Sequence, residues 1–244
     1  MMKLLAYPLT VLYLICFGLV LVVFHPIQWI CLRWFGYGAH AASVAWLNWS
    51  IMKCTHILGV RYRFTFADPM PEKGPLIIVT NHQSMYDIPP LIWHLRKYHP
   101  KFVSKKELGK GIPSVSFNLR HGGSALIDRR DRKQALSELT RLGEYIERTG
   151  RSAVIFPEGT RSRTGAPKPF KTFGLSVLMQ HAPSAKVLPI TINNSWKVFR
   201  YGKFPNGLGA HIRFTVHPAI PVSVLSEARI PELEALITSQ IDTP

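Results

Sequence analysis

The chain begins with an apolar segment unlike the rest of the sequence. Residues 4–24 contain no charged side chain, and residues 39–60 form a second apolar stretch with a single lysine. The first run is long enough to cross a hydrocarbon core of ~30 Å. It is also apolar on every face, unlike a helix that packs one stripe against a domain. We therefore predict a two-helix membrane-associated motif over residues 1–60, with a bend at His25-Pro26.

Two helices of this kind can cross the bilayer as a hairpin or lie within one leaflet. A cleaved signal peptide is a further alternative because Lys3 precedes the run, but the run exceeds a usual signal core and no small-residue cleavage site follows it. His40, Asn48 and Lys53 in the second stretch are costly at mid-bilayer, which favours the one-leaflet arrangement. Either arrangement leaves the rest of the chain on one side of the membrane.

Beyond residue 60 the pattern changes to short apolar runs separated by amphipathic stretches. Alternating or fully apolar runs predict strands at residues 61–66, 76–79, 101–104, 124–127, 153–156, 187–192 and 211–217. Helical periodicity predicts helices at residues 88–97, 134–149, 170–181 and 231–240. Strands that alternate with helices predict one α/β domain over residues 61–244, with helices on the faces of a sheet.

The formal net charge of +16 is unevenly distributed along this domain. Residues 96–133 carry eleven Lys or Arg against three acids, and residues 161–203 carry eight and no acid. Such segments attract an anionic membrane surface, a phosphorylated substrate or nucleic acid, and a basic solvated surface is the alternative. No RNA- or DNA-binding motif accompanies them, which weighs against a nucleic-acid-binding protein.

A histidine and an aspartate stand five residues apart where a predicted strand ends. His82 follows the strand at residues 76–79, and Asp87 comes within its reach once the chain bends. A carboxylate bonded to one imidazole nitrogen fixes the tautomer and leaves the other nitrogen free to accept a proton. Sites of open α/β sheets lie at strand carboxyl ends, where His82 falls. We interpret the pair as a candidate general base and its orienting acid; a purely structural histidine is the alternative.

A second polar segment, Phe-Pro-Glu-Gly-Thr-Arg-Ser at residues 156–162, follows another predicted strand. It places a carboxylate and a guanidinium on a tight glycine turn, and Arg129 follows a third strand. Guanidinium groups suit bidentate recognition of phosphate, whereas a surface ion pair is the alternative for Arg129. Residues 193–195 follow a further strand and could line the same edge. We predict an anion clamp beside the base.

Motifs for several other chemistries are missing from the sequence. It contains no GxSxG elbow, no GxxxxGK[ST] loop, no GxGxxG and no HExxH. The three cysteines lie in the apolar N-terminal region without CxxC or metal-ligand spacing, so we predict no metal and expect a reducing compartment. A base without a protein nucleophile implies that a substrate hydroxyl is the nucleophile, and it disfavours a membrane-anchored hydrolase.

Together these segments resemble the 1-acyl-glycerol-3-phosphate acyltransferase family. Residues 81–87 match its NHxxxxD block, and residues 156–162 match its FPEGTRS block. Residues 123–129 resemble its second block, residues 105–108 resemble the basic segment before that block, and residues 187–192 resemble its proline-bearing strand. The resemblance covers about residues 76–192. It implies a glycerol-3-phosphate acyltransferase-like fold, a mixed and largely parallel sheet flanked by helices.

The resemblance also implies roles for single residues. His82 takes the proton from the acceptor hydroxyl, Asp87 orients His82, and no acyl-enzyme forms. Other residues of the matched segments are expected to bind substrate, with the two arginines on its phosphate: Asn81, Lys105, Arg129, Glu158, Gly159, Thr160 and Arg161.

The implied reaction acylates the free sn-2 hydroxyl of 1-acyl-sn-glycerol-3-phosphate and gives phosphatidic acid for phospholipid biosynthesis. The donor is an acyl thioester of coenzyme A or of acyl carrier protein, and no cofactor is expected. Another lyso-lipid or glycerol-3-phosphate is the alternative acceptor, and a non-catalytic basic protein that binds membrane or nucleic acid is the alternative of a different class. Because thioester donors are made in the cytoplasm, we expect the active domain on the cytoplasmic side of the inner membrane, in contact with membrane lipids.

Overall fold

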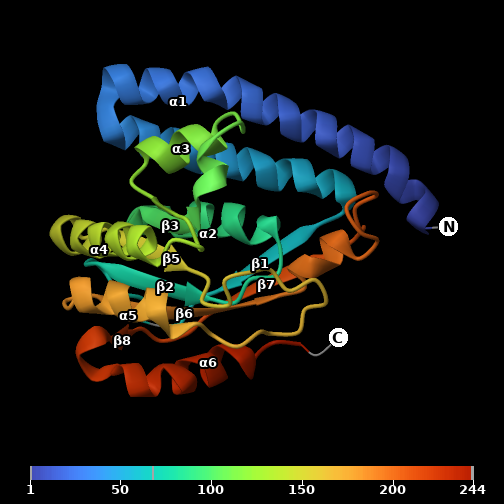
Figure 1. Ribbon diagram of the computed structural model, residues 1–244. Helices are drawn as coiled ribbons and strands as arrows, with labels where there is room; N and C mark the ends of the chain where they lie inside the picture. The colour runs from blue at the N-terminus through green and yellow to red at the C-terminus, as the bar shows by residue number, and fades with distance from the viewer. Residues whose placement is uncertain (1, 68, 243–244) are drawn as a thin grey trace.

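The computed structural model of the protein describes residues 2–67 and 69–242. An eight-stranded sheet forms its centre, with helices on both faces (Figure 1). The strand order is β1-β7-β6-β2-β5-β3-β4, with β8 paired to β6. Neighbouring strands are parallel except that β6 pairs antiparallel with β7 and β8. The predicted fold class, a mixed and largely parallel sheet flanked by helices, is confirmed.

The strands lie close to their predicted positions. They are β1 Arg61–Thr65, β2 Leu76–Thr80, β3 Pro100–Lys105, β4 Ala125–Ile127, β5 Ser152–Ile155, β6 Lys186–Asn193, β7 His211–Val216 and β8 Ile220–Pro221. The sequence pattern does not predict β8, because two residues are too few to show an alternation.

The helices are α1 Met2–Thr55, α2 Ile88–His94, α3 Val115–His121, α4 Arg132–Thr149, α5 Thr172–His181 and α6 Ile230–Thr238. Helix α3 is not among the predicted helices. Helix α4 begins after Asp131, whose side chain caps the N–H of Gln134, and ends at Gly150 with a φ of 66°. This cap and this glycine give α4 the clearest ends of any helix in the sequence.

Strand β2 lies at the centre of the molecule and separates two apolar cores. Its side chains alternate between the faces, as the period of a strand requires. Leu76 and Ile78 join a cluster that includes residues of α1 and α2, whereas Ile77 and Val79 join a cluster that includes residues of α4, α5 and α6. The continuous burial of β2 therefore comes from having helices on both sides.

The N-terminal segment bends at a different residue from the one predicted. Helix α1 continues through Pro26, and the backbone leaves the helical region at Gly36 instead (φ 77°, ψ −169°). Figure 1 shows that the chain reverses there into two arms that lie side by side. Leu21 of the first arm packs with Leu47 and Ile51 of the second. The predicted bend at Pro26 is wrong, and the two helical arms of α1 meet at Gly36 instead.

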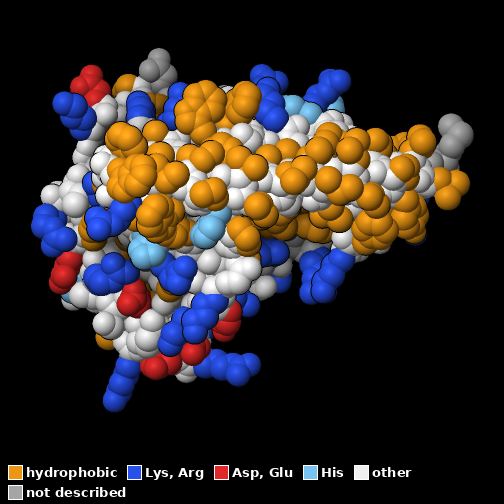
Figure 2. Space-filling model, turned by 90° about the horizontal axis from the view of Figure 1, so that it is seen from above, with side chains coloured by type: hydrophobic (Ala, Val, Ile, Leu, Met, Phe, Trp, Pro, Cys, Tyr) orange, Lys and Arg blue, Asp and Glu red, His pale blue; other side chains and the backbone are white. Residues whose placement is uncertain are grey.

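Helix α1 leaves much of its apolar surface uncovered. Its exposed side chains include Leu4, Leu19, Trp34 and Phe35, the last at 70% exposure. Figure 2 shows hydrophobic side chains in a continuous belt along this part of the molecule, with Lys and Arg at its margins. By length and composition, the segment Met2–Leu58 is apolar enough to cross a membrane. Exposed apolar surfaces of this extent are typical of sites that bind a membrane or another protein.

Strand pairing brings the two polar segments of the sequence together. Strand β2 pairs in parallel with β5 on one side and with β6 on the other. The carboxyl ends of these three strands therefore meet at one edge of the sheet. His82 follows β2, Phe156 follows β5 and Ser195 follows β6.

Candidate active site

His82 and Asp87 form a direct hydrogen-bonded pair. The Nδ1 atom of His82 lies 2.7 Å from Oδ2 of Asp87. Because a carboxylate can only accept, Nδ1 carries the proton and Nε2 presents its lone pair. His82 is 12% exposed and lines a large cavity. This is the geometry of a base with an orienting acid.

The aspartate of this pair is fixed on both of its oxygens. Besides His82, Oδ2 accepts the backbone N–H groups of Gln83 at 2.8 Å and Ser84 at 3.0 Å. The hydroxyl of Ser195 donates to the other oxygen, Oδ1. Asp87 is fully buried, so these four partners, not water, satisfy its carboxylate. A fully bonded carboxylate holds the imidazole in one orientation.

The second polar segment holds the backbone of His82 at both ends. The N–H of His82 donates to Oε1 of Glu158 at 2.8 Å, and its carbonyl accepts the N–H of Ser162 at 2.7 Å. The ring of Phe156 stacks on the imidazole with 4.0 Å between centroids. These contacts join segments 76 residues apart in sequence into one unit.

Glu158 accepts a hydrogen bond from the backbone of His82 and is itself buried. Glu158 is 2% exposed, and its Oε2 accepts the backbone N–H of Lys168 at 3.2 Å. Burial raises the pKa of Glu158 to about 7, against the lowering effect of its two backbone hydrogen bonds. Glu158 does not line the cavity. The structure therefore favours a positioning role for this residue over the predicted contact with substrate.

Asn81 also points into the protein. Its Nδ2 donates to the carbonyl of Ile192 at 2.8 Å, and its Oδ1 accepts the N–H of Ile192 at 2.7 Å. This paired bond ties the end of β2 to β6. Asn81 does not line the cavity, so its predicted contact with substrate is not supported by this geometry.

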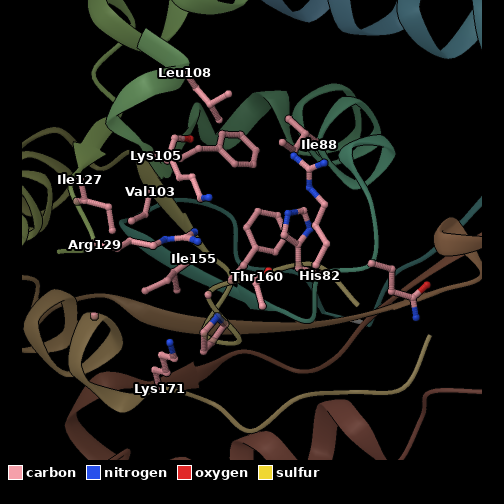
Figure 3. Close-up of a pocket in the computed structure, with 18 of the residues that line it drawn as sticks. His82, Ile88, Val103, Lys105, Leu108, Ile127, Arg129, Ile155, Thr160 and Lys171 are labelled. Carbon is pink, nitrogen blue, oxygen red and sulfur yellow. The ribbon is translucent and has the colours of Figure 1, made fainter. Parts of the chain in front are cut away.

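The cavity beside His82 has a volume of about 1010 Å³. This is at the upper end of ordinary ligand sites and suits a lipid-sized molecule. Figure 3 shows Lys105 and Arg129 on the side of the cavity opposite His82, with the apolar side chains of Val103 and Ile127 nearby. A base, several cations and apolar side chains therefore line the same cavity.

The lining of the cavity is strongly basic. Gly159 takes a φ of 68° that favours glycine, and the residues after it, Thr160 and Arg161, line the cavity. Among the described residues the lining includes no carboxylate and seven cations, which are Lys105, Arg129, Arg132, Arg161, Arg163, Lys171 and Lys203. The predicted clamp residues are thus brought together, and a phosphate would find several donors there.

The two predicted clamp arginines, Arg129 and Arg161, line the same cavity. Burial lowers the pKa of Arg129, the Glu107 carboxylate opposes this effect, and the Arg161 charge adds to it. Two guanidinium groups in one cavity repel each other until an anion occupies the space between them. The arrangement suits recognition of a doubly charged phosphate.

Some residues of this site could not be predicted from the sequence. Ser195 was expected only to lie near the edge, yet its side chain bonds to Asp87 and its N–H donates to Oε1 of Gln83 at 3.0 Å. Lys171 lines the cavity close to Gly159, and no motif marked it. In residues 2–67 and 69–242, no group of three His, Cys, Asp or Glu side chains is placed to hold a metal ion.

Comparison with known proteins decides the family. The family model described as Acyltransferase matches residues 61–193, more than half of the chain. The chain belongs to the acyltransferase family. The predicted family and the predicted enzyme class, an O-acyltransferase, are confirmed, and the alternative of a non-catalytic binding protein is set aside.

Several relatives of this acyltransferase carry more specific names. A 1-acyl-sn-glycerol-3-phosphate acyltransferase of Borreliella burgdorferi is 33% identical over 187 residues, which cover 76% of the chain and 72% of the relative. One of Helicobacter pylori is 39% identical over 132 residues, 52% of each chain. The human 1-acyl-sn-glycerol-3-phosphate acyltransferase beta is 28% identical over 206 residues, covering 84% and 71%.

A solved structure shares the fold of this acyltransferase over almost its whole length. The crystal structure of the 1-acyl-sn-glycerophosphate acyltransferase PlsC from Thermotoga maritima superposes with a TM-score of 0.78. The match covers 98% of this chain and 95% of the other, at 20% identity. It extends the fold assignment beyond the sheet to the kinked apolar helix α1.

Proposed function

We propose that the enzyme transfers an acyl chain from an acyl thioester to the sn-2 hydroxyl of 1-acyl-sn-glycerol-3-phosphate, giving phosphatidic acid. The observation that carries this proposal is the His82–Asp87 pair at the wall of a basic, lipid-sized cavity. The names of the relatives support the same acceptor. Acceptor, apolar chain and phosphate can all be accommodated in one cavity of this character.

In this mechanism His82 acts as a general base toward the acceptor. Its Nε2 takes the proton of the sn-2 hydroxyl as the oxygen attacks the thioester carbonyl carbon. A C–O bond forms, the C–S bond breaks, and the proton passes from His82 to the leaving thiolate. General base catalysis accounts for ~10²–10⁴-fold of the rate. Positioning of the two substrates supplies up to ~7–11 kcal/mol more where alignment is good.

The cations of the cavity hold the acceptor phosphate. Arg129 and Arg161 provide forked donors, and Lys105 and Lys171 add point charges. Thr160 lies beside them, where its hydroxyl can donate to the same phosphate. Holding the phosphate fixes the distance from the sn-2 hydroxyl to His82. We therefore expect the enzyme to prefer phosphate-bearing acceptors.

One assay tests the acceptor and the donor together. Purified enzyme is given 1-acyl-sn-glycerol-3-phosphate, glycerol-3-phosphate or a lyso-lipid with a neutral headgroup, each with acyl coenzyme A or acylated acyl carrier protein. Products are identified by mass. We expect phosphatidic acid as the main product, with at least one of the two thioesters. Faster acylation of the neutral lyso-lipid or of glycerol-3-phosphate would contradict the proposed acceptor.

We further propose that the enzyme works on the cytoplasmic side of the inner membrane. Helix α1 carries the exposed apolar surface, and the kink at Gly36 brings the chain back toward its start. The polar residues of the second arm favour insertion into one leaflet. Single cysteines placed at residues 30–40 test this. Labelling from the far side of the membrane would contradict one-leaflet insertion, and release by high salt alone would contradict apolar anchoring.

A further inference from the structure

A second cluster of basic and aromatic side chains lies away from His82, beneath the turn of α1. A small cavity of about 30 Å³ opens there, lined in part by His40, His99 and Lys101. Figure 1 shows this turn over the end of the sheet where β2 begins, whereas His82 follows the other end of β2. The two cavities share no lining residue. The cluster is therefore separate from the catalytic site.

Buried polar atoms without partners are concentrated in this cluster. Among the described residues, five buried side-chain atoms make no hydrogen bond, and three of them are Nε2 of His40, Nδ1 of His99 and the OH of Tyr37. His40 is only 1% exposed, and the rings of Tyr37 and His99 are 5.6 Å apart. Buried polar groups are nearly always hydrogen-bonded. Three buried polar atoms without a hydrogen-bond partner in one cluster indicate a binding partner that is not part of the chain.

Three cations surround these atoms without an acidic partner. Lys101 is 6% exposed, and its Nζ lies 4.8 Å from the ring centre of Tyr37. Arg151 covers the same ring at 3.5 Å, and Arg96 is exposed at the rim of the cavity. None of the three pairs with a carboxylate in the described part of the chain. Burial and then Arg151 lower the pKa of Lys101 to about 7, as expected for a cation without a counter-charge.

We propose that this cluster is a binding site for one phosphate group. The cavity has room for one water-sized group, so a single phosphate oxygen enters it to meet His40, His99 and Lys101. The remaining oxygens stay at the rim with Arg96, and Arg151, which covers the ring of Tyr37, adds its charge nearby. A phosphate accepts from every one of these donors and neutralises the cations, which a water molecule cannot do.

The phosphate can come from a lipid headgroup or from free inorganic phosphate. The turn above the cluster exposes Trp34 at 69% and Phe35 at 70%. Aromatic side chains gather at the level of lipid headgroups. A headgroup phosphate therefore lies within reach of the rim once the turn has entered the membrane, and free phosphate offers the same chemistry from solution.

NMR spectra of the full chain with isotope-labelled histidine, in micelles of an uncharged detergent, test the site directly. The ring signals of His40 and His99 are assigned from His40→Gln and His99→Gln. Inorganic phosphate is titrated in one series and a short-chain phosphatidic acid in another. We expect saturable shifts of both rings in at least one series. Shifts with phosphate alone assign the free anion, and shifts with the lipid assign the headgroup.

Two variants make the test specific. Lys101→Met keeps an apolar stem of similar length in the buried position, and Arg151→Gln changes a half-buried residue if the first variant fails to fold. Each should weaken the binding seen at His40 and His99 by about tenfold or more, because each removes a charge-assisted donor. Arg161→Ala, in the catalytic cavity, should leave it unchanged. No shift in either series, or equal shifts in both site variants and the original chain, would overturn the proposal.

Discussion

The hydroxyl of Ser195 donates a hydrogen bond to Oδ1 of Asp87, the carboxylate oxygen that His82 does not use. Ser195 follows β6, and 108 residues separate it from Asp87. The bond ties the base and its orienting acid to a third element of the fold. Ser195 is therefore a positioning residue that acts on His82 through Asp87.

Replacement of Ser195 by alanine should lower kcat about tenfold and leave the KM of both substrates within about twofold. The loss of a hydrogen bond to a charged group costs about 1.5–3 kcal/mol. Ser195→Thr, which keeps the hydroxyl, should recover part of the activity. Ser239→Ala, an exposed serine at the end of α6, is the matched control. A normal kcat in Ser195→Ala would show that the bond does not position Asp87.

Glu158 should make stability depend on pH. Because burial raises its pKa to about 7 in the folded protein, the folded state holds this proton more tightly than the unfolded state. The stabilisation is complete below about pH 4.5 and is lost as pH rises through about 7, with a total on the order of 3 kcal/mol. Glu158→Gln has no such titration.

Thermal unfolding of both proteins between pH 4.5 and 7.5 measures this difference. The melting temperature of the original enzyme should fall relative to Glu158→Gln as pH rises across that range. A constant difference between the two curves would mean that Glu158 titrates at its ordinary value despite its burial.

The phosphate clamp should act on the acceptor rather than on the donor. Arg161→Ala should reduce kcat/KM for 1-acyl-sn-glycerol-3-phosphate by about 10–100-fold, since one charge-assisted hydrogen bond is worth about 1.5–3 kcal/mol. The KM of the thioester should change little. Arg148→Ala, an exposed arginine of α4 outside the cavity, serves as the control. If only the donor KM rises, Arg161 belongs to the donor site instead.

A tyrosine pair links the apolar helix α1 to the turn that carries Asp87. Tyr86 donates its hydroxyl to that of Tyr13 in α1 at 2.9 Å and accepts from Nδ2 of Asn206 at 3.1 Å. Tyr86→Phe leaves two buried polar groups unpaired and should destabilise the enzyme by about 1–3 kcal/mol. Tyr13→Phe leaves the Asn206 bond in place and should cost less. Melting temperatures in one detergent compare them, and the reverse order would contradict this network.

The sequence predicted every strand of the described sheet except β8, as well as the local pair within the catalytic site. His82 and Asp87 are five residues apart, so a single turn brings them together, and short apolar runs located the ends of β2 and β5. Parallel pairing then places the following residues at one edge of the sheet. This much follows from local pattern and from the geometry of α/β sheets.

The orientation of Glu158 and the position of the bend in α1 depend on long-range contacts, which the periodicity of the sequence does not reveal. Glu158 was predicted to touch substrate, but pairing of distant backbones turns its carboxyl group toward the N–H of His82. The bend of α1 was expected at Pro26 because proline removes a helical hydrogen bond, yet a proline alone need not reverse the chain. Gly36 can adopt a positive φ and makes the reversal.

The orienting role of Asp87 has its own consequence. Asp87→Asn can donate where the carboxylate only accepts, so it favours the wrong imidazole tautomer. This variant should lose most of its turnover, although the asparagine side chain has nearly the same shape as the aspartate side chain. Its melting temperature separates a loss of orientation from a loss of fold. Full turnover in Asp87→Asn would mean that His82 needs no acidic partner.

The central claim is that His82 is the base of an acyl transfer that needs no protein nucleophile. The most direct measurement is the rate of phosphatidic acid formation, followed by mass spectrometry, for His82→Ala beside His211→Ala, an exposed histidine of β7. Both variants should melt near the temperature of the original enzyme. We predict a loss of at least ~10²-fold in His82→Ala alone. Turnover near the original rate in a folded His82→Ala enzyme would contradict the claim.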